Sequence, residues 1–222
     1  MCGIAGILKL DRSGIDAQIF KNFSDSLYTR GPDDFGFLGL SGTSTVKVSR
    51  NPDELLNPWL GLVHRRLAIL DLSEAGWQPM VTPDGRYAIV FNGEIYNYLE
   101  LQVELKSLGY TFHSHSDTEV LLAAYAHWGI EALNRLVGMF AFAILDTQQR
   151  SIFLARDFFG IKPLYYTHWQ NGFAFASEIK ALLQIPDLNR QANPQSLYDY
   201  LRFGFTDHGG ETLLANIHQH DR

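Results

Sequence analysis

Cysteine is almost absent from this sequence of 222 residues: the only one is Cys2, so the chain cannot form an internal disulfide. A disulfide framework is therefore excluded, and a reducing compartment fits this composition. The N-terminus also lacks a basic segment followed by a long apolar one, so no secretory signal peptide is predicted. The longest apolar run, residues 139–145, is far too short to span a bilayer. We expect a cytoplasmic protein with no membrane partner.

An excess of positive charge is missing as well. The 18 Lys and Arg residues are outnumbered by 24 Asp and Glu residues, which gives a net charge of -6, and no basic stripe stands out. This balance argues against nucleic acid or an anionic membrane surface as the main partner. The 46% of hydrophobic residues is enough for one substantial domain with its own core.

Short strands alternate with a few amphipathic helices in the hydrophobic pattern. The segment FAFAIL at 140–145 is apolar on both faces, so we expect the strand at 139–146 to lie between two covering layers. Packed antiparallel sheets with helices outside, an α+β arrangement, would satisfy this pattern. Strands are expected at residues 2–10, 35–40, 45–48, 60–63, 86–91, 139–146, 151–157, 164–167 and 173–176, and helices at 15–28, 97–108, 116–128, 177–184 and 194–203.

Two of these helices begin with capping signals. Asn97 stands three residues before Glu100, and Ser116 stands three residues before Glu119. The second pair has the S-x-x-E pattern of a capping box, in which each side chain bonds the backbone N–H of the other residue. Gly109 and Gly129 are the predicted helix stops.

Cys2, directly behind the initiator methionine, can be interpreted in two ways. Composition alone favours a small buried residue in a first strand. The alternative is that removal of Met1 leaves Cys2 at the N-terminus, where one residue carries both a thiol and a free α-amine. An α-amine has an ordinary pKa of about 7.7–8.0, so it can accept the thiol proton near neutral pH. Such a residue would be a nucleophile with its own base.

Asn92, Gly93 and Glu94 follow the strongest predicted strand. A side-chain amide and an unhindered backbone N–H are the donor types that stabilise an oxyanion. Taken alone, however, Asn-Gly is more often a turn. Glu94 could hold a substrate ammonium group.

Other polar residues give weaker signals. Arg65 and Arg66 precede an apolar segment, and arginine binds carboxylates bidentately, although a surface ion pair is commoner. Asp117 in a first helical turn could simply favour the helix dipole. The two histidine pairs, 113 with 115 and 218 with 220, lack a recognisable third ligand, so no metal site is expected.

Five segments together resemble the class II glutamine amidotransferases, whose glutaminase domains use an N-terminal nucleophile. They are CGIAG at 2–6, RGPD at 30–33, HRRLAILD at 64–71, NGEIYN at 92–97 and SDTE at 116–119. The segments RDFFGIKPLYY at 156–166 and FASEIKAL at 175–182 are similar to the glutaminase half of glutamine-hydrolysing asparagine synthetase. The resemblance implies a four-layer αββα sandwich of two antiparallel sheets. It also implies hydrolysis of L-glutamine to glutamate and ammonia.

The resemblance also implies roles for particular residues. Cys2 would be the nucleophile, and Asn92 with Gly93 the oxyanion hole. Arg66 and the backbone that follows it would hold the glutamine α-carboxylate, and Glu94 and Asp117 would hold the α-ammonium. That backbone comprises Leu67, Ala68, Ile69 and Leu70.

The match to asparagine synthetases stops before their ATP-using domain, whose phosphate-cradling Ser-Gly-Gly-x-Asp-Ser loop has no counterpart here. We therefore expect an amidotransferase domain at 2–217, a truncated tail at 218–222, and no cofactor in this chain. ATP and magnesium would serve only a synthetase domain in a longer protein. Alternatives are a non-catalytic glutamine-binding or regulatory fragment, or the glutaminase half of another amide-forming synthetase. A homodimer is also considered, because the apolar segment 197–205 would be left uncovered.

Overall fold

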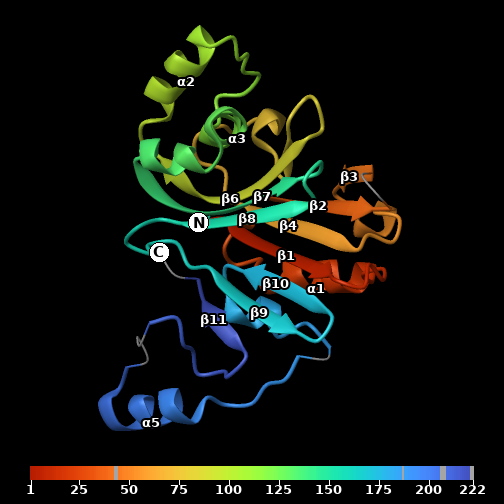
Figure 1. Cartoon of the computed structure of the whole chain (residues 1–222), viewed down its shortest axis with the longest axis vertical. Helices are drawn as coiled ribbons and strands as arrows, with labels where there is room; N and C mark the ends of the chain where they lie inside the picture. The colour runs from red at the N-terminus through yellow and green to blue at the C-terminus, as the bar shows by residue number, and fades with distance from the viewer. Residues whose placement is uncertain (43–44, 187, 206–208, 221–222) are drawn as a thin grey trace.

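The computed structural model describes residues 1–42, 45–186, 188–205 and 209–220. Its strands form two antiparallel sheets, one lying over the other in Figure 1. The larger sheet has the strand order β11-β9-β10-β1-β4-β2-β3 and the smaller one β5-β6-β7-β8. The first sheet contains β1 (Gly3–Lys9), β2 (Asp34–Ser41), β3 (Thr45–Ser49), β4 (Leu60–Arg66), β9 (Tyr165–Trp169), β10 (Gly172–Ala176) and β11 (Ile217–Gln219). The second contains β5 (Met80–Val81), β6 (Tyr87–Ile95), β7 (Gly138–Asp146) and β8 (Ser151–Arg156).

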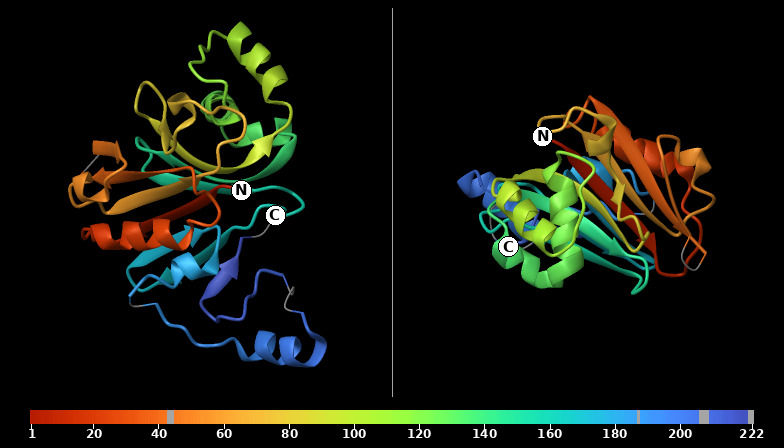
Figure 2. Two further views of the ribbon diagram at one scale, coloured as in Figure 1. Left: turned by 180° about the vertical axis from the view of Figure 1, so that it is seen from behind. Right: turned by 90° about the horizontal axis from the view of Figure 1, so that it is seen from above.

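Helices cover the outer face of each sheet, as the views in Figure 2 show. Helices α1 (Ala17–Ser26) and α4 (Ile179–Leu182) pack on the larger sheet, and α2 (Tyr98–Ser107) and α3 (Asp117–Trp128) pack on the smaller one. Short 3-10 turns lie in the connections at Pro52–Glu54, Glu74–Gly76 and Gly129–Arg135. The resulting order is helix, sheet, sheet, helix, which confirms the expected αββα sandwich.

Three hydrophobic clusters follow from the alternation of side chains along the strands. In β1, Ile4 enters the core between the sheets, whereas Ala5 and Ile7 face the helices α1 and α4. In β6, Val90 enters the same core between the sheets, whereas Phe91 faces α2 and α3. Residues at even positions of both strands therefore face each other between the sheets.

The capping predictions are partly wrong. The Asn97 side chain does not cap α2; it accepts from the Val137 N–H at 3.0 Å and donates to the Arg135 carbonyl at 2.9 Å. Ser116 does cap α3 through the Thr118 N–H at 3.1 Å, but the Glu119 carboxylate accepts from the preceding loop instead of completing the box. Distant backbone groups thus replace the local cap at Asn97, whereas at Glu119 the loop just before the helix does so. Gly109 and Gly129 have positive φ, as helix stops require.

The last part of the chain leaves the sandwich and returns to it. Helix α5 (Pro194–Phe203) lies apart from both sheets in Figure 1, and β11 then pairs with β9 at the edge of the larger sheet. The predicted domain boundary at 217 falls inside β11, and residues 221–222 of the expected tail lie outside the described residues.

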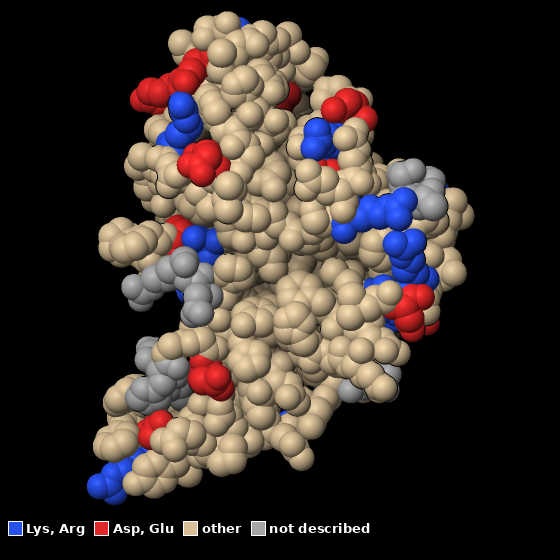
Figure 3. All heavy atoms as spheres, viewed as in Figure 1, with Lys and Arg blue, Asp and Glu red and all other residues tan. Residues whose placement is uncertain are grey.

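The helices and the surface charge of the described residues bear on possible membrane and nucleic-acid contacts. None of their helices is long and apolar enough to cross a membrane. On the face shown in Figure 3, basic and acidic side chains occur in small mixed groups.

Candidate active site

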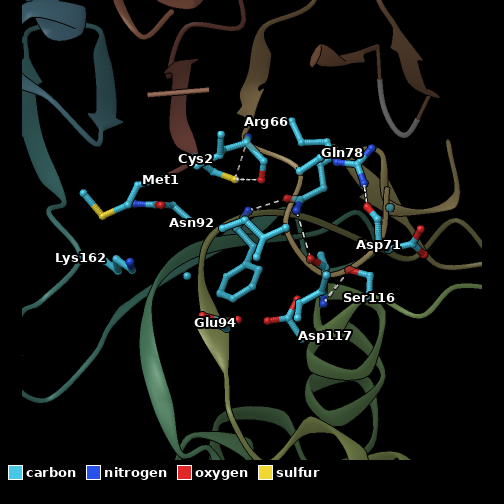
Figure 4. A pocket seen from close by; sticks show the side chains of 18 of the residues that line it. Met1, Cys2, Arg66, Asp71, Gln78, Asn92, Glu94, Ser116, Asp117 and Lys162 are labelled. Atoms are coloured by element: carbon cyan, nitrogen blue, oxygen red, sulfur yellow. Dashed lines mark hydrogen bonds between the residues drawn. The ribbon is translucent and has the colours of Figure 1, made fainter. Parts of the chain in front are cut away.

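One pocket brings together every residue that the sequence proposes for the site. Its walls come from the start of β1, the segment after β4, the end of β6 and the start of α3 (Figure 4). The predicted residues among its lining are Cys2, Arg66, Leu67, Ala68, Ile69, Leu70, Asn92, Gly93, Glu94 and Asp117. These segments are far apart in the sequence, so the fold assembles the candidate site.

Cys2 precedes β1 by one residue, and its thiol lies against the backbone of Leu67. The Leu67 N–H donates to Sγ at 3.4 Å, and Sγ lies 3.6 Å from the Leu67 carbonyl oxygen. Burial raises the pKa of the Cys2 thiol, and the Leu67 N–H opposes that rise. A base close to the sulfur would therefore be needed to form the thiolate at neutral pH.

Asn92 is fully buried, and neither polar atom of its side-chain amide has a hydrogen-bond partner among the described residues. It lies two positions after Val90 in β6 and therefore points between the sheets, toward the end of the core where Cys2 lies (Figure 4). Burying an amide without a partner costs about 1–3 kcal/mol. The Asn92 amide in the pocket wall can therefore donate a hydrogen bond to a substrate atom.

Gly93 lies within β6, so the Asn-Gly turn that its sequence allows does not form. β6 continues to Ile95 because β7 pairs with it along its whole length, down to Ile95 opposite Gly138. A Cβ at Gly93 would lie 2.4 Å from the Met139 carbonyl oxygen, so no side chain fits there.

The backbone of β6 directs alternate N–H groups to an edge that β5 leaves open. The Phe91 N–H donates to Gln78 Oε1 at 2.7 Å, and the Ile95 N–H donates to Asp117 Oδ2 at 2.9 Å. Since alternate residues of a strand face the same edge, the Gly93 N–H is directed between these two contacts. A donor that the sequence proposed for an oxyanion therefore faces the pocket.

Two carboxylates, Asp117 and Glu94, lie near each other in the pocket (Figure 4). Burial, helped by the neighbouring charge of Glu94, raises the pKa of Asp117 to about 6. The Ile95 N–H bond opposes this shift. Two neighbouring carboxylates, one of them buried, favour a bound cation such as an ammonium group.

Arg66 at the end of β4 lines the pocket, and two backbone carbonyl groups hold its guanidinium in place. Its guanidinium donates to the Ser73 carbonyl at 3.0 Å and to the Asp71 carbonyl. A Cβ at Gly76 would lie 2.4 Å from Arg66 Nη2, so only glycine leaves enough space for the guanidinium. The neighbouring Arg65 points the other way and donates to the Ser24 carbonyl at 3.0 Å. Only the second arginine of the pair therefore belongs to the pocket.

Three residues of the site have no role in the expectations from the sequence. Gln78 bridges Phe91 and Thr118, with its Nε2 donating to Thr118 Oγ1 at 3.1 Å. Arg30, inside a motif quoted above, donates from Nε to the Cys2 carbonyl at 2.9 Å. Lys162 lines the pocket and is only 4% exposed. Their local sequence gives no periodic or capping signal, and only the motif spacing could have pointed to Arg30 and Lys162.

The histidine pairs have other contacts. His113 lies 3.5 Å from Glu119, and the ring of His218 packs against Tyr166. Among the described residues there is no group of three or more His, Cys, Asp or Glu side chains that could hold a metal ion.

Comparisons with known proteins agree with this geometry. A family model described as a glutamine amidotransferase domain matches residues 1–221. Glutamine-hydrolyzing asparagine synthetase 1 of Bacillus subtilis is 40% identical over 220 residues, which are 98% of this chain and 32% of that protein. A putative glutamine-hydrolyzing asparagine synthetase of Mycobacterium tuberculosis is 52% identical over 128 residues, covering 55% of this chain and 20% of that protein. The chain thus spans about a third of the length of the B. subtilis relative.

A solved structure shares the fold. Glutamine phosphoribosylpyrophosphate amidotransferase from B. subtilis, complexed with ADP and GMP, superposes with a TM-score of 0.70 at 22% identity, over 87% of this chain and 46% of that one. This likeness bears on the architecture of the two sheets and their helices.

Proposed function

The chain belongs to the glutamine amidotransferase domain family, and from this premise we propose that it hydrolyses L-glutamine to glutamate and ammonia through a thioester on Cys2. The observation that carries the proposal is the buried, unpartnered amide of Asn92 in the same pocket as the Cys2 thiol. Such an amide is preorganised for a negative charge that develops on a substrate oxygen.

The reaction that we propose begins with removal of Met1, which gives Cys2 a free α-amine. The amine takes the thiol proton while Sγ adds to the side-chain carbonyl carbon of glutamine. The resulting oxyanion accepts from the Asn92 amide and the Gly93 N–H. As the carbon–nitrogen bond breaks, the protonated amine returns its proton to the leaving ammonia. Water then adds to the thioester, and its collapse releases glutamate and restores the thiol.

The rest of the pocket fits the other end of glutamine. We assign the α-carboxylate to Arg66 and to the backbone of residues 67–70, because a braced guanidinium binds a carboxylate with little loss of entropy. We assign the α-ammonium to Asp117 and Glu94, whose mutual repulsion a bound cation would relieve. These groups require no metal or organic cofactor for hydrolysis.

In the whole protein, we propose that the ammonia reaches a synthetase segment that makes asparagine with ATP and magnesium. The support for this is the identity to asparagine synthetases about three times longer than the chain. We also propose that the protein works in the cytoplasm, because its nucleophile is a free thiol.

Three measurements on the chain test this function. Protein whose intact mass lacks Met1 is expected to release glutamate and ammonia in equal amounts from glutamine without ATP, and C2A protein to release neither. Protein that retains Met1 is expected to bind glutamine without turnover. Formation of asparagine from aspartate, glutamine and ATP-magnesium by this chain, or no hydrolysis by the processed protein, would contradict the proposal.

A further inference from the structure

Lys162 is held by its backbone so that its side chain enters the active-site pocket. Its N–H donates to Asp157 Oδ2 at 3.0 Å, and its carbonyl accepts from Arg156 Nε at 2.8 Å. Asp157 also fixes the preceding residue, accepting from the Ile161 N–H at 2.9 Å. Positive φ at Gly160 and the ring of Pro163 further restrict the loop. The backbone of Lys162 is therefore fixed through both its N–H and its carbonyl group.

The Lys162 side chain is largely buried, and its ammonium has no direct partner among the described residues. The residue is 4% exposed, and within the described ranges its Nζ makes no hydrogen bond or ion pair. In Figure 4 it lies on the side of the pocket where Met1 lies. Lysine is almost never this buried unless it is paired, so an unpaired one in a pocket wall calls for a functional reason.

Several other charged groups face this end of the pocket. Arg30, Glu94, Asp157 and the Cys2 thiol all act on Lys162, and burial is the main cause of its lowered pKa. The carboxylate of Asp157 is occupied by backbone N–H groups, and Arg30 is bound to the Cys2 carbonyl and to Glu178. Burial lowers the pKa of the Met1 amine, and the positive charges of Arg30 and Lys162 lower it further. The Cys2 thiol and Asp33 oppose this shift.

We propose that Lys162 is a positioning residue of the glutaminase site, whose positive charge in the pocket wall keeps the α-amine of processed Cys2 in its uncharged, proton-accepting form. This inference rests on the proposed function. An amine can take the thiol proton only when it is neutral, and a nearby cation disfavours its protonated state. Lys162 thus acts through Cys2 and forms no bond to glutamine.

The test compares charge-changing variants by the pH dependence of kcat/KM, on protein whose intact mass lacks Met1. Coulomb's law gives a shift of roughly half to one pKa unit for a charge about 6 Å away when the effective dielectric constant is about 40 to 80, as in a pocket open to water. K162M should therefore move the acid limb of the profile up by about half to one pH unit and lower activity at pH 6.5 by three- to tenfold. K162R should keep the wild-type profile. K106M, which removes an exposed charge on α2, is the matched control and should also leave the profile unchanged.

A second readout does not depend on glutamine. Because Cys2 is the only cysteine, alkylation by iodoacetamide reports the reactivity of this one thiol. K162M should slow alkylation of folded protein at neutral pH, whereas K106M should not. If K162M does not fold, K162Q takes its place.

The outcomes separate the two proposals. Processed wild-type protein that is alkylated normally but hydrolyses no glutamine contradicts the proposed function. Active K162M with a wild-type acid limb overturns the role of Lys162 and leaves the glutaminase function intact. Slower alkylation without a shift of the acid limb also overturns the assignment to the amine.

Discussion

Cys2 directly precedes β1 of the larger sheet and Asn92 lies in β6 of the smaller one, yet both side chains enter one pocket at the end of the core between the sheets. Each lies two positions from a residue of that core, Ile4 in β1 and Val90 in β6. The alternation of strand side chains therefore sends both toward the same space. Packing of the two sheets thus brings the thiol and the amide together, so the distance between them depends on the rigid core.

The first prediction concerns Met1. While Met1 is attached, the nitrogen of Cys2 is an amide with no useful basicity, so hydrolysis should require its removal. Preparations with increasing fractions of processed chain should show kcat in proportion to that fraction, measured by intact mass and glutamate release. Full activity of Met1-retaining protein would exclude the amine as the base.

Asn92→Ala should act mainly on kcat. Removing one oxyanion donor costs about 10²–10³ in rate, whereas the ground-state amide of glutamine gains less from it. The matched control is N97A, since Asn97 bonds only the backbone of Arg135 and Val137 outside the pocket. N97A should lower the melting temperature and leave kcat unchanged. An effect of N92A on KM alone would refute the oxyanion assignment.

The Asn92 prediction also shows how far the sequence reaches. The sequence motif around Asn92 predicts an oxyanion donor, but Asn-Gly is also typical of a turn. Only the pairing of β6 with β7 excludes that turn. Nearly all strands could be predicted, because alternation and apolar runs are local signals, whereas the four αββα layers were implied by the family resemblance. Gln78 could not, because its partners Phe91 and Thr118 come from segments that only the tertiary fold brings together.

The predicted cap at Asn97 failed for the same reason. Asn97 has a local partner in α2, but a loop 40 residues away offers it two backbone groups instead. Lys162 stands in one of the motifs that carry the resemblance, but no local signal predicts its burial, since a lysine in a loop is ordinarily solvated. Its burial follows from Asp157 and Arg156, whose bonds to the loop are not visible in the sequence.

Arg66→Ala should raise KM for glutamine by ten- to a hundredfold. A hydrogen bond to a charged group contributes about 1.5–3 kcal/mol, and each 1.4 kcal/mol is a factor of ten. R65A is the control, because Arg65 is buried but binds Ser24 and stacks over Phe35 away from the pocket. R65A should lower stability and leave KM within about threefold. Equal KM effects of the two variants would place the carboxylate elsewhere.

Asp117→Asn should weaken the binding of glutamine by about the same factor as Arg66→Ala. At the same time it should stabilise the folded protein at neutral pH. Burial raises the pKa of Asp117 to about 6 from the ordinary value of 3.8. A carboxyl with a raised pKa in the folded state favours folding only while it is protonated, so its ionisation destabilises the fold as pH rises through 6. Asparagine keeps an acceptor for the Ile95 N–H without the charge.

The expected gain from D117N in the free energy of unfolding is therefore about 1–3 kcal/mol at pH 7.5, and it should shrink toward zero near pH 4. Urea unfolding at the two pH values measures it. D16N, at the exposed start of α1, is the control and should show no such gain, because Asp16 accepts a capping bond at the surface. A gain independent of pH would contradict the pKa assignment.

The last prediction concerns the apolar surface of α5. Most of this helix is uncovered: Leu197, Tyr198, Tyr200, Leu201, Phe203 and the following Phe205 are all exposed. Only Ser196 and Asp199 are buried in the helix. A cluster of large apolar side chains that stays in water favours association, so the chain alone should dimerise or aggregate as its concentration rises. Sedimentation velocity over a concentration series measures this.

Leu201→Glu and Phe203→Glu should shift the chain toward monomer, because a charge in an apolar contact has to be desolvated. The variants should keep wild-type kcat/KM, since α5 contributes no residue to the lining of the active-site pocket. V103E is the matched control: Val103 on α2 is 69% exposed beside exposed Leu99 one turn away, a smaller apolar group than that of α5, so the variant should associate like the wild type. A wild-type chain that stays monomeric at all concentrations would show that this surface needs no cover. If association instead falls equally in V103E, net charge would be the cause, and α5 would have no special part in it.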